Sequence, residues 1–351
     1  MINVEDIAKE FAVNGKIIEI SPLGNGHINS TFLVKTSNNS YVLQKINDSI
    51  FKDVDLLMNN INEVTSFLRS NGIETLTIIP TTNGKLFAKV DEGYFRVYEL
   101  IENALTYEEV KDKDMLYNLG KAYGKLHKDL AKFDATKLGE VIPNFHNTKR
   151  RYENLLDAIK NAKIKRLHVC LEEIEQINKY EKEYDKVVNL INEGKIRTSV
   201  THNDPKINNV MFDKNSGAIR CIIDLDTIMP GSYLYDVGDA LRSLFTGENE
   251  DNKDTSTVGV DLEVFKAYIS GYLSEMKNVL TETEINLLAF SGFLLTMECG
   301  IRFLEDFLRE DIYFHTTYPE HNLVRAWTQI KLANDIYNSL DELNRIVVSL
   351  L

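Results

Sequence analysis

The hydrophobic pattern of this chain changes once, close to Ile101, and that change limits what the chain can fold into. Before this point, short runs alternate apolar with polar residues and are separated by turns rich in Gly and Asn, which is typical of antiparallel strands. One stretch, 53–70, instead carries its apolar residues at helical spacing. After Ile101, helical spacing dominates to the end. We therefore predict an α+β fold with two lobes: an antiparallel-sheet N-terminal lobe over 1–101 and a mainly helical C-terminal lobe over 102–351.

Length and charge limit the partners of the chain. A chain of 351 residues is longer than the chains that usually fold around a single hydrophobic core, which also favours two lobes. The net charge is −13 and no basic block stands out, so nucleic acid and anionic membranes are not expected as partners. No apolar run approaches the roughly 20 residues that span a bilayer. We expect a monomer that binds small molecules.

The cysteines and the N-terminus bear on the compartment. Cys170, Cys221 and Cys299 are isolated, have no metal-ligand spacing and are odd in number, which is typical of reduced thiols. The N-terminus is acidic and lacks the apolar core of a signal peptide. We therefore predict a cytoplasmic location.

One short stretch gathers side chains that suit phosphoryl transfer. Asp204 is followed by Lys206 and Asn209, and Asp224 comes after a short apolar run further along. Phosphoryl transfer from ATP needs a carboxylate that orients the acceptor hydroxyl, a cation facing the phosphoryl group, and Asn and Asp oxygens for Mg²⁺. We predict Asp204 and Lys206 as catalytic residues, Asn209 and Asp224 as metal ligands, and ATP and Mg²⁺ as cofactors. An Asp before Pro205 is also a common turn device, but that interpretation leaves the other three residues unexplained.

Several positions keep two interpretations. Glycines flank Asn25, so Asn25 and Gly26 belong either to a plain hairpin turn or to a loop that covers a phosphate with its backbone N–H groups. Gln44 and Lys45 are adjacent on a predicted strand and must face opposite ways, so either one contacts the nucleotide. Asp226 is either a second metal-shell group or a helix-cap residue.

Two features of the predicted helix over 112–133 are assigned to packing. Gly120 and Gly124 lie four residues apart, and because a helical Gly costs about 1 kcal/mol relative to Ala, close helix packing is the expected reason for both. His127 lies beside the apolar stripe of the same helix and is interpreted as a packing residue rather than a catalytic one.

The order of the motifs resembles the aminoglycoside phosphotransferase and choline kinase-like family. The motifs are His202-x-Asp204 with Asn209, Ile223-Asp224, and Tyr235-Asp236-Val237-Gly238-Asp239. Over most of the chain, the resemblance implies a protein kinase-like fold with a hinge near 98–101. It also implies nucleotide contacts from Glu99 and Ile101, a bracing role for His202, and an Asp236 that ties the catalytic loop to the large lobe.

A closer likeness concerns the substrate. The segments 24–29, 42–47, 202–209 and 223–231 resemble the N-acetylhexosamine 1-kinase branch of that family. This resemblance implies transfer to the anomeric hydroxyl of N-acetylglucosamine or N-acetylgalactosamine, with the sugar held by His27, Asp204, Arg302 and Tyr313. The chain departs from many members of the wider family at Gln44, where those members carry a basic residue.

Other interpretations remain open at this stage. Arg302 lies in an apolar helix, and a salt bridge to Glu298 or Glu305 would explain it equally well. Tyr313 is equally compatible with plain packing. Choline, an aminoglycoside or another hydroxyl acceptor is the alternative substrate; choline would need an aromatic cage, and an aminoglycoside would need clustered carboxylates. A nucleotide-binding pseudokinase is disfavoured because the catalytic and metal-binding residue types are all present.

Overall fold

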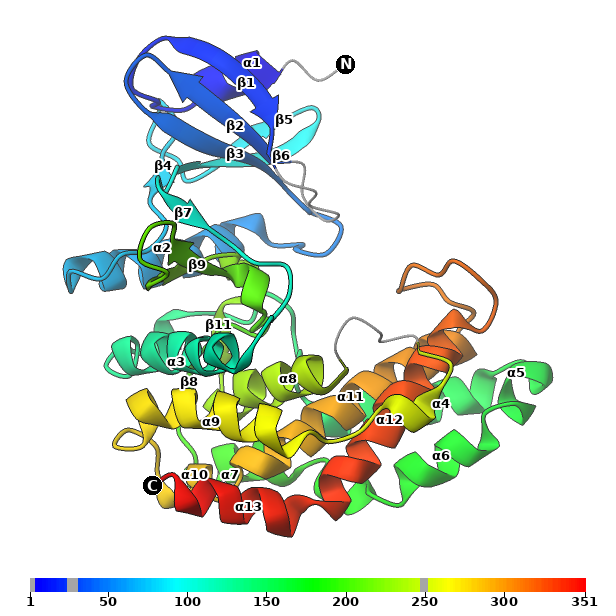
Figure 1. Ribbon diagram of the computed structural model, residues 1–351. Helices are drawn as coiled ribbons and strands as arrows, with labels where there is room; N and C mark the ends of the chain where they lie inside the picture. The colour runs from blue at the N-terminus through cyan, green and yellow to red at the C-terminus, as the bar shows by residue number, and fades with distance from the viewer. Residues whose placement is uncertain (1–3, 24–30, 247–251) are drawn as a thin grey trace. The chain divides into compact units, whose positions relative to one another are not determined.

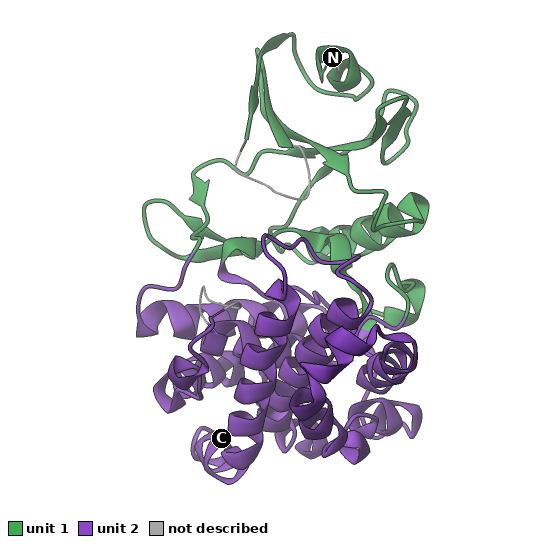
Figure 2. Ribbon diagram, turned by 90° about the vertical axis from the view of Figure 1, so that its right-hand side faces the viewer, with its two compact units in different colours: residues 1–108, 132–143, 208–230 green, residues 109–131, 144–207, 231–351 purple. Residues whose placement is uncertain are grey.

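The computed structural model describes residues 4–23, 31–246 and 252–351 (Figure 1). The chain forms two compact units (Figure 2). The first unit contains residues 1–108, 132–143 and 208–230, and the second contains 109–131, 144–207 and 231–351. The predicted α+β class is confirmed, with an antiparallel sheet near the N-terminus and helices towards the C-terminus. The lobe boundary after residue 101 stays a prediction.

The first unit is built on an antiparallel sheet in the order β1-β2-β3-β6-β4, with β5 paired to β6. The strands are β1 (Ile17–Pro22), β2 (Thr31–Thr36), β3 (Ser40–Ile46), β4 (Ile78–Ile79), β5 (Ala88–Val90) and β6 (Gly93–Glu99). The short helix α1 (Val4–Lys9) packs its buried Ile7 and Ala8 with Leu43 and Val97 of the sheet. Alternating residues of β3 and β6 therefore supply the core on this face.

The predicted helix over 53–70 is α2 (Val54–Ser70). Asp53 caps it, because the Asp53 carboxylate accepts a hydrogen bond of 2.9 Å from the Leu56 N–H. A smaller sheet in the same unit has the order β10-β9-β7, formed by β7 (Ala104–Leu105), β9 (Val210–Asp213) and β10 (Ile219–Ile222). The 3₁₀ turns are η1 (Ala135–Lys137), η3 (Ile207–Asn209) and η4 (Leu225–Thr227), and β11 (Met229–Gly231) follows.

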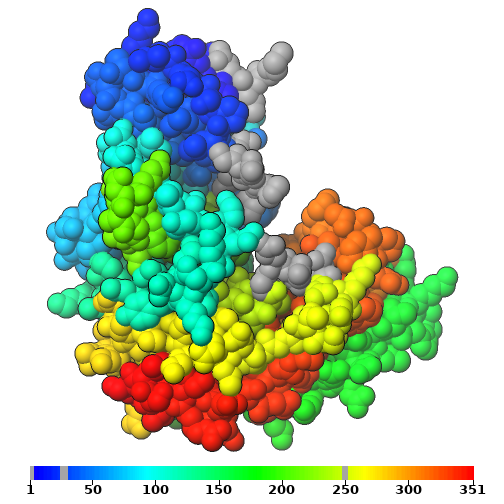
Figure 3. All heavy atoms as spheres, viewed as in Figure 1, coloured from blue at the N-terminus to red at the C-terminus, as the bar shows by residue number. Residues whose placement is uncertain are grey.

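The described part of the second unit is mainly helical and also contains β8 (Ser199–Thr201) and the 3₁₀ turns η2 (Glu181–Glu183) and η5 (Thr255–Thr257). Its first helices are α3 (Lys113–Asp129), α4 (Thr148–Asn161), α5 (Ile164–His168), α6 (Leu171–Asn178) and α7 (Lys186–Asn192). The later ones are α8 (Tyr233–Thr246), α9 (Leu262–Met276), α10 (Glu282–Ile285), α11 (Leu288–Leu308), α12 (His321–Asn338) and α13 (Leu340–Ser349). Nearly every residue of α11 is buried, so α11 is the core helix of this unit. Helices α9 and α13 contact each other at its surface, yellow and red in Figure 3.

Close packing of α3 against α9 explains the helical glycines. A Cβ atom on Gly120 would lie 2.0 Å from the Tyr268 carbonyl oxygen, and one on Gly124 would lie 2.8 Å from the Tyr272 carbonyl oxygen. On α9, a Cβ atom on Gly271 would clash in the same way with the carbonyl oxygen of Tyr117. The predicted packing role of Gly120 and Gly124 is therefore confirmed.

Within the described ranges, no helix has both the length and the apolar character that crossing a membrane requires.

Candidate active site

The two predicted catalytic residues lie together in the second unit. The segment that follows β8 carries them, and Lys206 Nζ lies 2.8 Å from Asp204 Oδ1. Both side chains keep partial exposure, 30% for Asp204 and 45% for Lys206. Burial lowers the pKa of Lys206, but the facing Asp204 carboxylate outweighs this effect and leaves the pKa raised. The ammonium group of Lys206 therefore stays charged at neutral pH beside the carboxylate.

Asp236 holds the backbone of this loop in place. The N–H groups of His202 and Asn203 donate to its two carboxylate oxygens, at 2.8 and 2.6 Å. Asn203 has a φ of 65°, a left-handed conformation that costs energy for a residue other than Gly. The carboxylate of Asp236 compensates for that conformation because it binds the two successive N–H groups that the turn exposes. The role that the family resemblance implied for Asp236 matches these contacts.

His127 is a hydrogen-bonding residue rather than plain packing, which corrects our interpretation. It is fully buried, with Nε2 2.7 Å from Asp236 Oδ2 and Nδ1 3.0 Å from the Tyr272 hydroxyl. Its ring stacks on Tyr233 at 4.7 Å. Burial raises the pKa of Asp236, but the interactions with His127 and, after it, with His202 outweigh burial, so the pKa of Asp236 is lowered. The sequence offered no local signal for this pair, because the partners are 109 residues apart.

His202 and Tyr123 brace the same loop from within. The Asp204 N–H donates to His202 Nδ1 at 3.3 Å, and the His202 ring meets Tyr123 edge-on at 5.6 Å. The Tyr123 hydroxyl donates to the Lys206 carbonyl oxygen at 3.0 Å. These contacts fix the loop on both sides of Asp204, in agreement with the bracing role expected for His202.

Arg302 does not form either of the salt bridges considered from the sequence. Glu298 binds His146 Nδ1 at 2.9 Å and the Thr148 hydroxyl at 2.6 Å, while Glu305 pairs with Arg309 at 3.0 Å. Both salt-bridge interpretations are therefore wrong.

The guanidinium of Arg302 instead lies over two aromatic rings, at 5.7 Å from the centre of Phe145 and 5.4 Å from that of Phe314. Among the described residues, no hydrogen bond or ion pair is found for it. Arg151, a residue that sequence reasoning missed in a highly charged helix, lies nearby: burial first, and then the charge of Arg302, lower its pKa.

Tyr313 lies in the loop between α11 and α12 and is 64% exposed. Asp306 holds the loop, because its carboxylate accepts hydrogen bonds from the N–H groups of Tyr313 and Phe314 at 2.8 and 2.9 Å. The Tyr313 ring meets the Phe314 ring edge-on at 4.8 Å. Tyr313 is thus linked through Phe314 to the aromatic surroundings of Arg302, and the residue as a whole is mostly exposed.

The two predicted metal ligands lie in the first unit. The Ile223 N–H donates to the Asn209 carbonyl oxygen at 2.9 Å, which ties the segments that carry Asn209 and Asp224 together. Asp224 is exposed and left-handed, with φ and ψ both 58°. A strained, exposed Asp is typical of a functional position. Within the described ranges, no group of three or more His, Cys, Asp or Glu side chains is arranged so that it could hold a metal ion by itself. One carboxylate and one amide oxygen fit Mg²⁺, which binds through few protein groups plus phosphate and water oxygens.

The sheet of the first unit separates Gln44 from Lys45. Gln44 pairs with Arg96 across the sheet, and Arg96 Nε donates to Gln44 Oε1 at 3.1 Å. Arg96 also forms an ion pair with Asp226. Lys45 projects from the opposite face, where its side chain lies against Gly93. The helix-cap interpretation of Asp226 is wrong, because Asp226 lies within η4 and its carboxylate pairs with Arg96.

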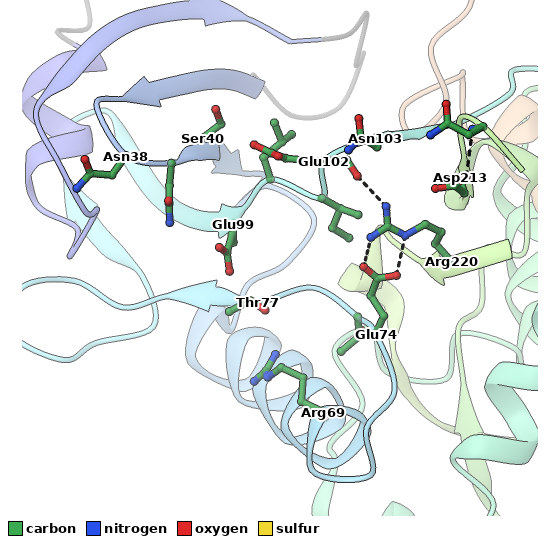
Figure 4. A pocket seen from close by; sticks show the side chains of 15 residues that line it. Asn38, Ser40, Arg69, Glu74, Thr77, Glu99, Glu102, Asn103, Asp213 and Arg220 are labelled. Carbon is green, nitrogen blue, oxygen red and sulfur yellow. Dashed lines mark hydrogen bonds and ion pairs between the residues drawn. The ribbon is translucent and has the colours of Figure 1, made fainter. Parts of the chain in front are cut away.

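Of the remaining residues predicted to bind the nucleotide, some lie within the described ranges and others lie outside them. Glu99 and Ile101 line a cavity of about 840 Å³ in the first unit (Figure 4). One wall of this cavity is an ion pair in which Arg220 Nε lies 2.8 Å from Glu74 Oε2, and Arg220 also donates to the Glu102 carbonyl oxygen at 2.7 Å. Gln44 and Lys45 are not among its lining residues. Asn25, Gly26 and His27 lie outside the described residues.

Comparison with known proteins identifies the family. The model of the phosphotransferase enzyme family matches residues 19–272. The structure is similar to a microcompartment-associated aminopropanol kinase, at 15% identity over 97% of this chain and 98% of that chain, with a TM-score of 0.59. It is similar to an aminoglycoside phosphotransferase from Alicyclobacillus acidocaldarius, at 12% identity over 99% and 97%, with a TM-score of 0.64. It is also similar to a choline kinase from Streptococcus pneumoniae, at 13% identity over 90% and 94%, with a TM-score of 0.52.

At these identities the solved structures establish the fold, and the family model, which covers well over half of the chain, establishes membership. The chain belongs to the phosphotransferase enzyme family and is a small-molecule phosphotransferase with an alcohol group as acceptor.

Proposed function

We propose that this enzyme transfers the γ-phosphoryl group of ATP to the anomeric hydroxyl of an N-acetylhexosamine, giving the sugar 1-phosphate and ADP. The observation that carries the choice of acceptor is Arg302, a guanidinium placed over Phe145 and Phe314 without a carboxylate partner among the described residues. A positive group of this kind donates hydrogen bonds to neutral hydroxyl and carbonyl oxygens. It repels the cationic ammonium groups of choline and aminoglycosides.

In this proposal the second unit supplies the groups that act on the acceptor. Asp204 accepts a hydrogen bond from the acceptor hydroxyl and takes its proton late in the transfer. Lys206, held beside Asp204 at 2.8 Å, neutralises the negative charge of the phosphoryl oxygens. Arg302 and Tyr313 donate to the sugar, together with His27. A polar site of this kind favours sugars, because every buried donor must find a partner and an acceptor that lacks the matching oxygen is rejected.

The first unit supplies the groups for the nucleotide. Asn209 and Asp224 would hold Mg²⁺, which when bound neutralises the phosphate oxygens of ATP. Asn25, Gly26, Glu99 and Ile101 are proposed to bind the nucleotide, together with Gln44 or Lys45.

The test measures ADP release with a panel of acceptors. The panel contains N-acetylglucosamine, N-acetylgalactosamine, their 1-O-methyl glycosides, choline and an aminoglycoside, and the variant Asp204→Asn is the inactive control. We expect turnover with the free sugars and none with the methyl glycosides, which lack the anomeric hydroxyl. Turnover of a methyl glycoside would place the transfer at another hydroxyl. Turnover of choline or the aminoglycoside alone would overturn the sugar assignment, and no turnover despite nucleotide binding would favour a pseudokinase.

A further inference from the structure

Among the described residues, the strand lysine Lys45 and the helix glutamate Glu63 do not form the ion pair that protein kinases have between a strand and a helix. Kinases pair a strand lysine with a helix glutamate. In this chain, Lys45 projects from the sheet face opposite to Gln44, and Glu63 on α2 is exposed. Neither Lys45 nor Glu63 has an ion-pair partner within the described ranges. On the other face of the sheet, the residue next to Lys45 is Gln44, which has no charge.

Arg96 places a buried cation on that same face. It is 1% exposed, forms an ion pair with Asp226, and its Nε donates to Gln44 Oε1 at 3.1 Å. Its guanidinium lies 5.2 Å from the centre of the Tyr98 ring. Burying an ion pair gains little stability over well-packed apolar side chains, because both charges lose their water. Stability alone therefore does not account for a fully buried Arg–Asp pair at this point of the chain.

The partner of Arg96 lies two residues after the proposed metal ligand. Asp224 immediately precedes η4 (Leu225–Thr227), and Asp226 lies within that single turn. The left-handed backbone of Asp224 is unfavourable for a residue other than Gly and persists only where its surroundings impose it. The ion pair with Arg96 fixes η4 to the sheet.

Helix α2 holds the same turn from a second direction. The buried side chain of Asn60 donates to the Ile228 carbonyl oxygen at 2.9 Å and to the Gly139 carbonyl oxygen at 2.8 Å, and it accepts from the Gly139 N–H at 3.1 Å. The residues directly after Asp224 are thus fixed by the sheet through Arg96 and by the helix through Asn60. In kinases the glutamate also comes from a helix, but the lysine comes from the third strand, where this chain carries Gln44; Arg96 lies on the neighbouring strand β6.

We propose that Arg96 is a positioning residue, which acts through Asp226 to hold Asp224 in the conformation that binds the divalent cation of the metal–nucleotide complex. This inference rests on the proposed use of a metal–ATP complex, and it does not depend on the identity of the acceptor. It assigns Asp226 the role of counter-ion to Arg96 and not that of a second metal ligand.

The test measures metal binding directly. Mn²⁺ replaces Mg²⁺ as a spectroscopic probe, and electron paramagnetic resonance follows free Mn²⁺ in the presence of a non-hydrolysable ATP analogue. We expect Arg96→Lys and Asp226→Asn to weaken Mn²⁺ binding by about 10- to 100-fold, as is usual when a partner that orients a metal ligand is lost. Affinity for the analogue without metal should stay unchanged, because neither substitution removes a group proposed to contact the nucleotide.

Two comparisons separate positioning from general stability. Lys35→Met removes an exposed ion pair with Glu19 on the same sheet and should leave Mn²⁺ binding unchanged. The double variant Arg96→Met with Asp226→Leu replaces the buried pair by apolar side chains, and should fold yet bind Mn²⁺ as weakly as either single variant.

Three results would overturn the proposal. The first is unchanged Mn²⁺ binding in folded Arg96→Lys and Asp226→Asn proteins. The second is a further loss on adding Asp226→Asn to an Arg96→Met background, because Asp226 would then act as a metal ligand itself. The third is failure of the unaltered protein to bind Mn²⁺ with the analogue, which would also remove the proposed use of metal–ATP. Failure of the sugar panel with Mn²⁺ binding intact would overturn the proposed acceptor alone.

Discussion

His127 Nε2 lies 2.7 Å from Asp236 Oδ2, and the same oxygen accepts the N–H of His202 at 2.8 Å. One buried carboxylate oxygen thus links α3 to the loop that carries Asp204. Because a side chain that is held this way from several directions cannot rotate freely, the position of the catalytic loop depends on a residue that lies on a different helix.

Replacement of His127 should therefore affect both stability and transfer. His127→Phe keeps the stacking on Tyr233 but removes both hydrogen bonds, and leaves Asp236 with one partner fewer. We expect the free energy of unfolding to fall by about 1–3 kcal/mol, and kcat to fall while the KM for ATP stays unchanged. Urea unfolding and steady-state kinetics measure these quantities. His168→Phe, at an exposed position on α5, is the control; an unaffected kcat in folded His127→Phe would show that the link does not order the loop.

The lowered pKa of Asp236 predicts how stability depends on pH. A carboxyl whose pKa is lower in the folded state stabilises the protein fully above its unfolded pKa of about 3.9, and loses that contribution as pH falls towards the folded pKa. We expect Asp236→Asn to be less stable than the unaltered protein at pH 7, with the difference narrowing below about pH 4. Thermal unfolding between pH 7 and pH 3 measures the difference. A constant difference over this range would contradict the assignment.

Close contact between α3 and α9 leaves no room at Gly120. A Cβ atom there would lie 2.0 Å from the Tyr268 carbonyl oxygen, which belongs to backbone and cannot move aside without shifting the helix. We expect Gly120→Ala to lower the free energy of unfolding by about 1–3 kcal/mol or more, although Ala is the better helix former. Chemical denaturation followed by circular dichroism measures the change. Gly259→Ala, whose nearest atom would be the Asp335 carboxylate at 3.3 Å, should be close to neutral.

Arg302 should matter for the acceptor and not for the nucleotide. Arg302→Met keeps an apolar contact with Phe145 and Phe314 and removes the donors. Loss of a hydrogen bond from a charged group costs about 1.5–3 kcal/mol, so the KM for the sugar should rise by about 10- to 100-fold with the KM for ATP unchanged. Arg309→Met, which removes the ion pair with Glu305 just beyond the C-terminal end of α11, is the matched control. Equal effects of the two substitutions on the sugar KM would contradict a direct contact.

The sequence pattern was sufficient to predict those features that depend on residues close together along the chain. Alternation of apolar residues indicated the strands of the first sheet, and helical spacing over 53–70 indicated α2 almost to the residue. The spacing of Asp204 and Lys206 brought both groups into one short loop, where they meet at 2.8 Å. Neighbours this close along the chain have few conformations open to them, so residue type and spacing are informative.

Tertiary structure alone decided which distant groups are paired. The sequence did not decide the role of Asp226, and only the folded structure shows that Arg96, 130 residues away, is its partner. His127 was interpreted as a packing residue because its partner Asp236 lies on another helix. Glu298 was considered as a partner of Arg302, but it binds His146, which is also distant in the sequence. A buried charge must find a partner, but many carboxylates and cations along a chain satisfy that rule equally. Packing of whole elements selects among them, and that selection is not encoded in any short stretch of sequence.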